Sequence, residues 1–255
     1  MIINTYKPVG VTSFEIIRQV KKRYPGQKVG YVGTLDPMAD GVLLVLTGDD
    51  TKKCQELVDL PKEYEFTVVF GIATDSGDIL GLVKPEIPST IEITAKSLKA
   101  TTAKFVGKYR QTVPAFSSVK YKGKELYKLA HRNLAPAGLP VKEVAIYKIE
   151  LLKFKTLPYS ELEKEIFERL KKLGTNVKQF RGEQVITAWQ DYFKGYKGDR
   201  GDRDAKIATI RATVSRGTYI RSLAEDIGKK LGTSAMCLSI TRTKVGDWSS
   251  IRDYP

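Results

Sequence analysis

Cysteine and histidine are scarce in this chain of 255 residues. The two cysteines, Cys54 and Cys237, lie far apart, and His131 is the only histidine. This pattern gives no sign of a disulfide framework or a thiolate metal site, and it argues against a zinc hydrolase. A Ser-His-Asp triad would depend on His131 alone, and no P-loop or GxGxxG motif is present. We therefore expect no metal and no cofactor, with chemistry left to carboxylate, Tyr, Lys, Arg or Ser side chains.

Long apolar runs are absent as well. No stretch approaches the roughly 20 residues that a membrane-spanning helix needs, and the N-terminal sequence MIINTYKPVG lacks the apolar centre of a signal peptide. We expect a cytoplasmic protein with no membrane partner. With 42% hydrophobic residues, the chain is long enough to bury a substantial core.

Acidic residues are outnumbered, since 29 Asp and Glu against 43 Lys and Arg give a formal net charge of +14. Clustered basic side chains gain affinity for nucleic acids by releasing counterions from phosphates. We favour a polyanionic partner, with nucleic acid as the leading candidate, over the alternative of a basic protein without such a partner.

Hydrophobic periodicity predicts strands interspersed with helices. Alternating or continuous apolar residues predict strands over residues 42–46, 64–72, 142–155 and 206–215. Helical spacing predicts helices over residues 12–24, 160–173 and 218–231. This order favours a mixed α/β body.

Local signals mark the ends of these helices. Thr12 with Glu15, and Ser160 with Glu163, have the spacing of a capping box. Gly174 and Gly232 follow the second and third helices, where glycine commonly ends a helix. The glycine-rich and charged stretch at 194–206 indicates a solvated loop.

Two charged residues occupy unusual positions. Asp36 stands between a glycine-flanked turn and the apolar run 42–46, and Pro37 biases it toward extended geometry. It is either an Asx-turn residue or a catalytic carboxylate on a rigid loop. Arg221 falls in the first turn of the predicted helix 218–231, where the macrodipole disfavours a cation. Either it is exposed to solvent or a buried carboxylate compensates its charge.

Several motifs in order resemble those of the TruB family of tRNA pseudouridine synthases. YKPVGVTS at 6–13 resembles the family's N-terminal motif, and GTLDPMADGVL at 33–43 resembles the motif that contains its catalytic aspartate. Three further segments that follow in the family's order lie at 62–81, 113–132 and 214–232. The resemblance covers most of the chain. It implies a pseudouridine synthase fold of the α/β (α+β) type, with a mixed, mostly antiparallel sheet flanked by helices and a central catalytic cleft.

The resemblance also implies roles for individual residues. Asp36 would be the nucleophilic or base carboxylate, paired with Arg221, and Tyr64 would pack against the flipped uracil with Tyr219 in the same pocket. The implied reaction is the isomerisation of a T-loop uridine of tRNA to pseudouridine. Without the motifs, both tyrosines have equally good interpretations as ordinary aromatic residues of a sheet and a helix.

Other positions are candidates for contact with the RNA. Tyr31 stands where the family usually has a histidine associated with opening the T loop, and tyrosine can stack and hydrogen-bond but does not become cationic near neutral pH. The candidate contacts to the RNA backbone are Lys7, Lys120, Arg216, Arg242, Lys171 and Lys172.

We expect one catalytic domain over residues 1–255 that acts as a monomer on the T-arm of tRNA, without the C-terminal PUA module of many relatives. Residues 156–206 form a longer connection than usual, and their basic side chains indicate either a substitute RNA-binding element or a solvated helical face. The alternative function is a non-catalytic RNA-folding or ribosome-associated protein on the same fold. A carbohydrate hydrolase is disfavoured because no comparable motif supplies a second acid.

Overall fold

The strands expected from the sequence join into a nine-stranded sheet in the computed structural model, which describes residues 1–85, 92–174, 181–199 and 204–249. The strand order is β1-β3-β10-β4-β9-β8-β5, with β2 paired to β3 and β11 to β10. The pairing of β3 with β10 is parallel and the other pairs of this sheet are antiparallel. The predicted mixed, mostly antiparallel sheet is therefore confirmed.

The strands of this sheet are β1 (Ile2–Lys7), β2 (Val29–Val32), β3 (Asp40–Thr47), β4 (Lys62–Phe70), β5 (Gly107–Thr112), β8 (Val141–Pro158), β9 (Asp204–Val214), β10 (Ala235–Val245) and β11 (Trp248–Ser249). A separate small hairpin consists of β6 (Lys120–Tyr121) and β7 (Lys124–Glu125).

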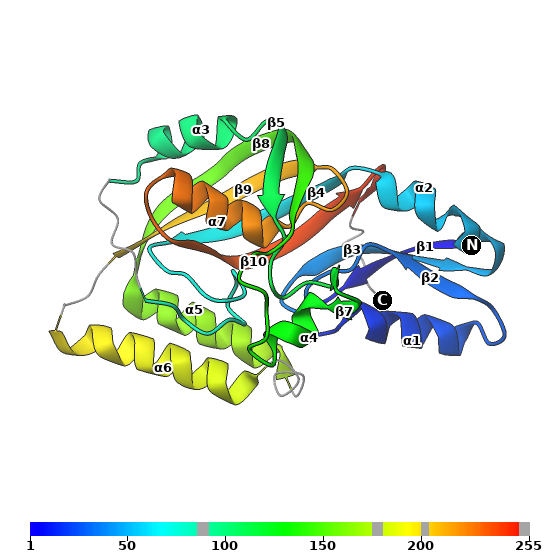
Figure 1. Ribbon diagram of the computed structural model, residues 1–255, viewed down its shortest axis with the longest axis horizontal. Helices are drawn as coiled ribbons and strands as arrows, with labels where there is room; N and C mark the ends of the chain where they lie inside the picture. Colours follow the sequence, from blue (N-terminus) through cyan, green and yellow to red (C-terminus); the bar gives the residue numbers. More distant parts are fainter. Residues whose placement is uncertain (86–91, 175–180, 200–203, 250–255) are drawn as a thin grey trace.

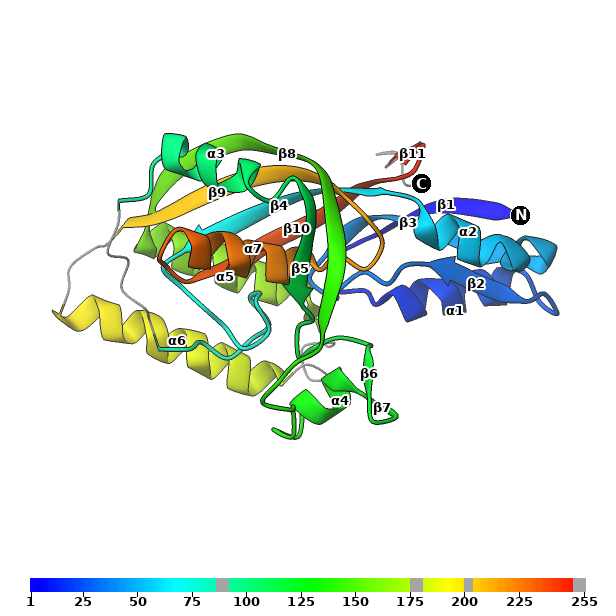
Figure 2. The same cartoon turned by 45° about the horizontal axis from the view of Figure 1, so that its top comes forward.

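The helices are α1 (Ser13–Arg23), α2 (Cys54–Asp59), α3 (Ala95–Ala103), α4 (Leu126–Ala130), α5 (Tyr159–Lys172), α6 (Gly182–Asp199) and α7 (Ile220–Lys230), with a 3-10 helix at Gly48–Lys53. Figure 1 shows α7 in front of the sheet, α3 at its upper edge and the pair α5 and α6 below it. The helices α1 and α2 lie beside β1, β2 and β3 at one end of the molecule (Figures 1 and 2). No helix among the described residues is long and apolar enough to cross a membrane.

The main core lies between the sheet and the helices α5, α6 and α7. Along α7, buried Ile220, Leu223, Ala224 and Ile227 follow the helical spacing seen in the sequence. Gly232 after this helix has a φ of +70°, and the backbone N–H of Thr233 donates to the carbonyl of Gly228. The predicted helix and its glycine cap are confirmed.

The predicted start of α1 is confirmed, whereas that of α5 is wrong. Thr12 accepts a hydrogen bond from the backbone N–H of Glu15, and Glu15 completes the capping box. The helix α5 instead begins at Tyr159, directly after the long strand β8, and its N-cap is Pro158. Ser160 therefore lies inside the helix and is not its N-cap, because β8 continues three residues past its predicted end and the helix starts without an intervening loop.

The prediction of a solvated loop over 194–206 is wrong for its described residues. The helix α6 continues to Asp199 and the strand β9 begins at Asp204, while residues 200–203 lie outside the described ranges. The helix was missed because Gly195 and Gly198 lower helix propensity. Three apolar residues spaced by four, Val185, Trp189 and Phe193, are nonetheless buried along α6, and their packing outweighs that cost.

Candidate active site

The loop between β2 and β3 that carries Asp36 is held by the N-terminal motif. The backbone N–H of Gly10 donates to the Pro37 carbonyl at 3.0 Å, and the Leu35 N–H donates to the Ser13 hydroxyl at 3.0 Å. The Lys7 ammonium donates to the Ala39 carbonyl. The motifs at 6–13 and 33–43 thus form one unit, because residues of the first motif bind the backbone on both sides of Asp36.

Lys7 is fully buried beside this loop. Its burial lowers its pKa from 10.5 to about 8, although Asp36 and Asp40 partly oppose the shift. Burial of this cation is compensated because it donates to the carbonyls of Pro8 and Ala39 and lies near the carboxylates of Asp36 and Asp40.

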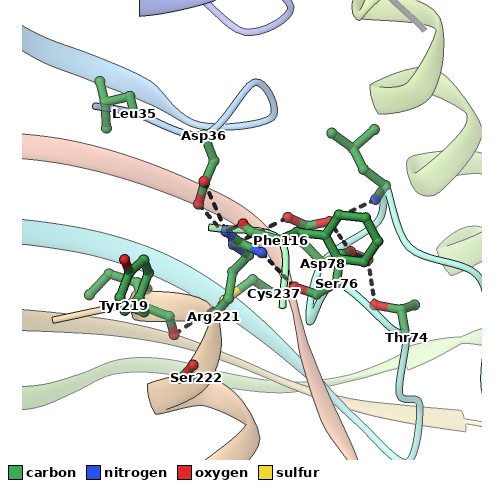
Figure 3. A network of polar contacts seen from close by, with 12 residues as sticks. Leu35, Asp36, Thr74, Ser76, Asp78, Phe116, Tyr219, Arg221, Ser222 and Cys237 are labelled. Atoms are coloured by element: carbon green, nitrogen blue, oxygen red, sulfur yellow. Dashed lines mark hydrogen bonds and ion pairs between the residues drawn. The ribbon is translucent and has the colours of Figure 1, made fainter. Parts of the chain in front are cut away.

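The predicted pairing of Arg221 with Asp36 is present and is bidentate. Arg221 Nε lies 2.8 Å from Asp36 Oδ2, and one terminal nitrogen lies 3.0 Å from Asp36 Oδ1 (Figure 3). Arg221 is 3% exposed, whereas the Asp36 side chain is 36% exposed. The arginine is therefore a buried support, and the carboxylate that it holds remains open to solvent or a ligand.

Two backbone carbonyls complete the setting of Arg221. Its remaining terminal nitrogen donates to the Ser76 carbonyl at 2.7 Å, and the nitrogen facing Asp36 also donates to the Phe116 carbonyl at 2.9 Å. These carbonyls belong to the segments TDSGD and VPAFSS, so three parts of the chain meet at one guanidinium (Figure 3). The charge of Arg221 in the first turn of α7 is therefore compensated by a carboxylate. Of the two interpretations of this residue from the sequence, solvent exposure is wrong and pairing with a carboxylate is confirmed.

Asp78 is a further carboxylate at this site that the sequence analysis missed. Its side chain is 4% exposed and lies 3.5 Å from Arg221 Nε. Burial raises the pKa of Asp78, and the negative charge of Asp36 adds to the shift, while Arg221 opposes it. The Ser76 hydroxyl and the Leu80 N–H donate to Asp78 Oδ1 at 2.6 Å and 2.9 Å. A carboxylate in the glycine-flanked segment TDSGD was the available signal, but such segments more often form turns.

Tyr219 occupies the N-cap of α7, next to Arg221. The side chain of buried Gln111 accepts from the Tyr219 N–H at 2.8 Å and donates to the Tyr219 carbonyl at 3.0 Å. Burial raises the pKa of the Tyr219 hydroxyl. Gln111 on β5, which the sequence analysis did not single out, thus fixes the start of the helix that carries Arg221.

Tyr64, the third predicted residue of the base pocket, lies in the sheet. It is half-buried on β4, opposite Arg242 of β10. Arg242 in turn pairs with Gly41 at the start of β3. The role of Tyr64 in stacking on a base, and the central cleft expected beside Asp36, stay predictions.

Two of the predicted contacts to the RNA backbone are buried. Lys7 and Arg242 are at most 1% exposed, and Arg242 donates to the carbonyls of Val42 and Gly33. Both cations bind carbonyl groups around the Asp36 loop, so their placement does not support contact with phosphates.

The other predicted RNA-facing residues reach the surface. Lys120, Lys171 and Lys172 are exposed, and Arg216 is 52% exposed with an ion pair to Asp59. Tyr31 is partly buried, and its hydroxyl lies 3.3 Å from that of Thr34. No cluster of three or more His, Cys, Asp or Glu residues able to hold a metal ion occurs within the described ranges.

Comparisons with known proteins find similar sequences. The family model described as "TruB family pseudouridylate synthase (N terminal domain)" matches residues 21–168. A protein named tRNA pseudouridine synthase B from Francisella tularensis subsp. novicida (strain U112) is 35% identical over 246 residues, which cover 96% of this chain and 64% of that protein. A protein of the same name from Fusobacterium nucleatum subsp. nucleatum is 34% identical over 248 residues, covering 97% of this chain and 68% of that protein.

Solved structures share the fold. A chain of the "Cbf5-Nop10-Gar1 Complex" aligns with a TM-score of 0.59 at 23% identity, over 99% of this chain and 50% of its own length. A chain of an H/ACA RNP bound to a substrate RNA aligns with a TM-score of 0.56 at 21% identity, over 99% and 49%. The chain thus spans less than two thirds of the Francisella relative and about half of these structures. From the family model and the curated relatives, it follows that the chain belongs to the TruB family of pseudouridylate synthases.

Proposed function

We propose that the protein converts a uridine in the T loop of tRNA to pseudouridine, with Asp36 as the reacting carboxylate. The observation that carries the proposal is the bidentate ion pair between the partly exposed Asp36 and the buried Arg221. The name tRNA pseudouridine synthase B, given to relatives that align with nearly the whole chain, supports the substrate class.

In this reaction the N1–C1′ bond of the uridine breaks, the base rotates while it stays bound, and a C5–C1′ bond forms. C5 loses a proton and N1 gains one, so substrate and product have the same composition and the balance requires no cofactor. Asp36 acts either as the nucleophile or as the base, and both roles require the ionised carboxylate. The guanidinium of Arg221 holds the Asp36 carboxylate in place by two hydrogen bonds.

The base must leave the loop stack before it reaches Asp36. Tyr64 and Tyr219 are proposed to line the base pocket, where an aromatic surface offsets part of the cost of unstacking. Tyr31, on the strand before the Asp36 loop, is proposed to help open the T loop by stacking. Lys120, Arg216, Lys171 and Lys172 are proposed to contact RNA phosphates.

Asp36 and Arg221 come from the same chain, which supports action as a monomer. A tRNA substrate supports the cytoplasm as the compartment.

Incubation of a T-loop transcript with the purified protein, followed by mapping of pseudouridine, tests the proposal. The unchanged protein should modify one T-loop uridine. Asp36→Asn should form none while its RNA affinity stays within a few-fold, because it removes the reactive charge but little phosphate contact. The matched control is Asp49→Asn, since Asp49 is exposed on the 3-10 helix, and it should keep its activity.

Two results would count against the proposal. RNA binding by the unchanged protein without any pseudouridine would favour the RNA-folding alternative. Pseudouridine formation by Asp36→Asn at the unchanged rate would show that Asp36 is not the reacting carboxylate.

A further inference from the structure

The segment between β8 and β9, formed by α5 and α6, directs its polar contacts toward the loops of the candidate site. It packs on the sheet through apolar side chains that are almost fully buried: Leu162, Ile166, Leu170, Val185, Trp189 and Phe193. Such packing alone would make α5 and α6 a cover for the sheet. Four further contacts reach the loops that surround Arg221 and Asp36.

The first contact joins Arg181, directly before α6, to Asp75. The two terminal nitrogens of Arg181 lie 2.7 Å and 3.0 Å from the two carboxylate oxygens of Asp75. The side chains are 13% and 28% exposed, so this bidentate pair is only partly screened by solvent. Asp75 immediately precedes Ser76, whose carbonyl accepts from Arg221.

Asp75 also connects the two arms of its own loop, residues 73–84, by hydrogen bonds. Its backbone N–H donates to the Leu82 carbonyl at 3.0 Å, and its Oδ1 accepts from the Leu82 N–H at 2.8 Å. A shift of Asp75 would therefore move the loop that presents the Ser76 carbonyl and the Asp78 carboxylate to Arg221.

The second contact places the same guanidinium on Phe116. The central carbon of Arg181 lies 4.6 Å from the centroid of the Phe116 ring, within the range of a cation–π interaction. The carbonyl of Phe116 is the other backbone acceptor of Arg221. Arg181 thus contacts Phe116, which carries one of the two carbonyls that hold Arg221, and Asp75, which precedes the residue that carries the other.

Two more contacts involve the helices themselves. The indole N–H of buried Trp189 on α6 donates to the Ile79 carbonyl in the 73–84 loop at 3.0 Å. The Lys172 carbonyl of α5 lies so close to Gly10 that an added Cβ would come within 2.7 Å of it. Gly10 is the residue that donates to the Pro37 carbonyl beside Asp36.

We propose that the α5–α6 segment is a brace for the candidate active site, with Arg181 as its positioning residue. It acts through the 73–84 loop and Phe116, which fix Arg221 and, through Arg221, the carboxylate of Asp36. The effect on turnover rests on the proposed function. Figures 1 and 2 both show the N-terminal end of α6 near α4.

Hydrogen exchange tests the brace without any assumption about the reaction. Arg181→Met keeps an L side chain at the same positive φ of 60° and retains an apolar stem, but it removes both hydrogen bonds to Asp75. Protection of amides in the 73–84 loop should fall by about ten-fold, because the loop loses a charge-assisted pair. The strands β1 and β3 should keep their protection.

A matched control separates the brace from a general loosening of the segment. Arg169→Met removes another arginine–carboxylate contact of the same segment, in which two nitrogens donate to Glu165 Oε1 within α5, and it should leave exchange in the 73–84 loop unchanged. Unchanged exchange in Arg181→Met would overturn the proposal. Asp75→Asn provides a second variant that weakens the same pair from the other side, and it should reproduce the result.

Turnover then tests the positioning role. If Arg181 acts through Arg221, Arg181→Met should lower kcat roughly ten-fold or more and leave the KM for RNA within about two-fold, since misplacement of a reacting group costs rate rather than binding. The double variant with Asp75→Asn should lose no more than the larger single loss. Faster exchange with an unchanged kcat would overturn the positioning role, as would a change confined to KM. Absence of pseudouridine with the unchanged protein would refute the proposed function, and the exchange result would then decide on the brace alone.

Discussion

Arg221 satisfies two carboxylates and two carbonyls with one planar group. A guanidinium has five N–H donors in a fixed fork, and the partners of Arg221 lie along it: Asp36, Asp78, Ser76 and Phe116. Lysine has one nitrogen on a flexible stem and cannot bridge the same positions. The geometry around Asp36 therefore depends on the identity of residue 221 as well as on its charge.

Arg221→Lys should abolish most of the proposed activity and destabilise the fold. The change leaves buried acceptors unsatisfied, so we expect the free energy of unfolding to fall by about 2–4 kcal/mol and pseudouridine formation to fall at least about a hundred-fold. Urea unfolding and the T-loop assay measure the two effects. As a control, Arg211→Lys on β9 alters a more exposed contact, in which two nitrogens donate to Glu65 Oε1, and should cost less than about 1 kcal/mol.

Lys7 predicts a specific dependence of stability on pH. Its pKa is about 8 in the folded protein against an ordinary value of 10.5, so between these values the unfolded chain binds more protons than the folded one. Stability contributed by this group therefore rises with pH across the interval and is lost as the pH falls through it, by up to about 3 kcal/mol in total.

The free energy of unfolding of the unchanged protein, minus that of Lys7→Met, should accordingly increase as the pH is raised from 7 to 9.5. The comparison of the two curves removes the titration of other groups, while the lost hydrogen bond to the Ala39 carbonyl gives a constant offset. Parallel curves would contradict the lowered pKa of Lys7. Lys7→Met should also disturb the Asp36 loop, since Ala39 lies in it.

The sequence predicted the partners at the centre of the site but not the groups that position them. The motifs led to Asp36 and Arg221, because their types and order resemble those of the family. Asp78 and Gln111 were missed, since their importance depends on contacts between segments far apart in the sequence. Lys7 and Arg242 were expected to bind phosphate because a cation in sequence carries no sign of its burial.

At the scale of elements, periodic patterns located the strands and the helix α7, and local end signals had mixed success. The spacing Thr12 to Glu15 forms a capping box in α1, whereas the same spacing from Ser160 lies one residue inside α5. The N-cap of α5 is Pro158, whose side chain has no hydrogen-bond acceptor, and Ser160 is the second residue of the helix. The same spacing thus falls at the N-cap in α1 and inside the helix in α5, because β8 continues to Pro158.

Thr12→Ala should lower the free energy of unfolding by about 1 kcal/mol, because it removes the acceptor for the Glu15 N–H at the start of α1. Thr12→Ser retains that acceptor and should have little effect. Chemical denaturation of both variants measures the difference. Equal stability of Thr12→Ala and the unchanged protein would mean that the start of α1 is held by the neighbouring hydrogen bond between Ser13 and Leu35.

At the scale of the whole molecule, the excess of positive side chains includes both exposed cations and cations buried inside the fold. The net charge of +14 indicated a nucleic acid partner. Several of the counted cations are internal, however: Lys7, Arg221 and Arg242 are buried against carbonyls and carboxylates, and Arg181 is bound to Asp75. A count of charges thus overstates the number of phosphate contacts. Candidates for RNA binding are better drawn from exposed cations such as Lys171 and Lys172 at the end of α5.

The salt dependence of RNA binding decides whether the end of α5 contacts RNA. Two exposed lysines, Lys171 and Lys172, lie at this end of α5, whereas Arg181 before α6 is bound to Asp75. If both contact phosphates, replacing them by Ala should reduce the slope of log affinity against log salt by up to about one unit each. Activity at saturating tRNA should survive, since these residues would supply binding rather than stabilisation of the transition state.

A control of equal charge distinguishes direct contact from a general loss of positive charge. Lys52 and Lys53 lie on the 3-10 helix, paired with Asp49 and Asp50, and their replacement by Ala should leave the slope nearly unchanged. A minimal T-arm hairpin, which presents fewer phosphates beyond the loop, should be less sensitive to the loss of Lys171 and Lys172 than full-length tRNA. An unchanged slope with full-length tRNA would show that the exposed face of α5 is solvated, and the role of this segment would then lie in its inward contacts through Arg181 and Trp189.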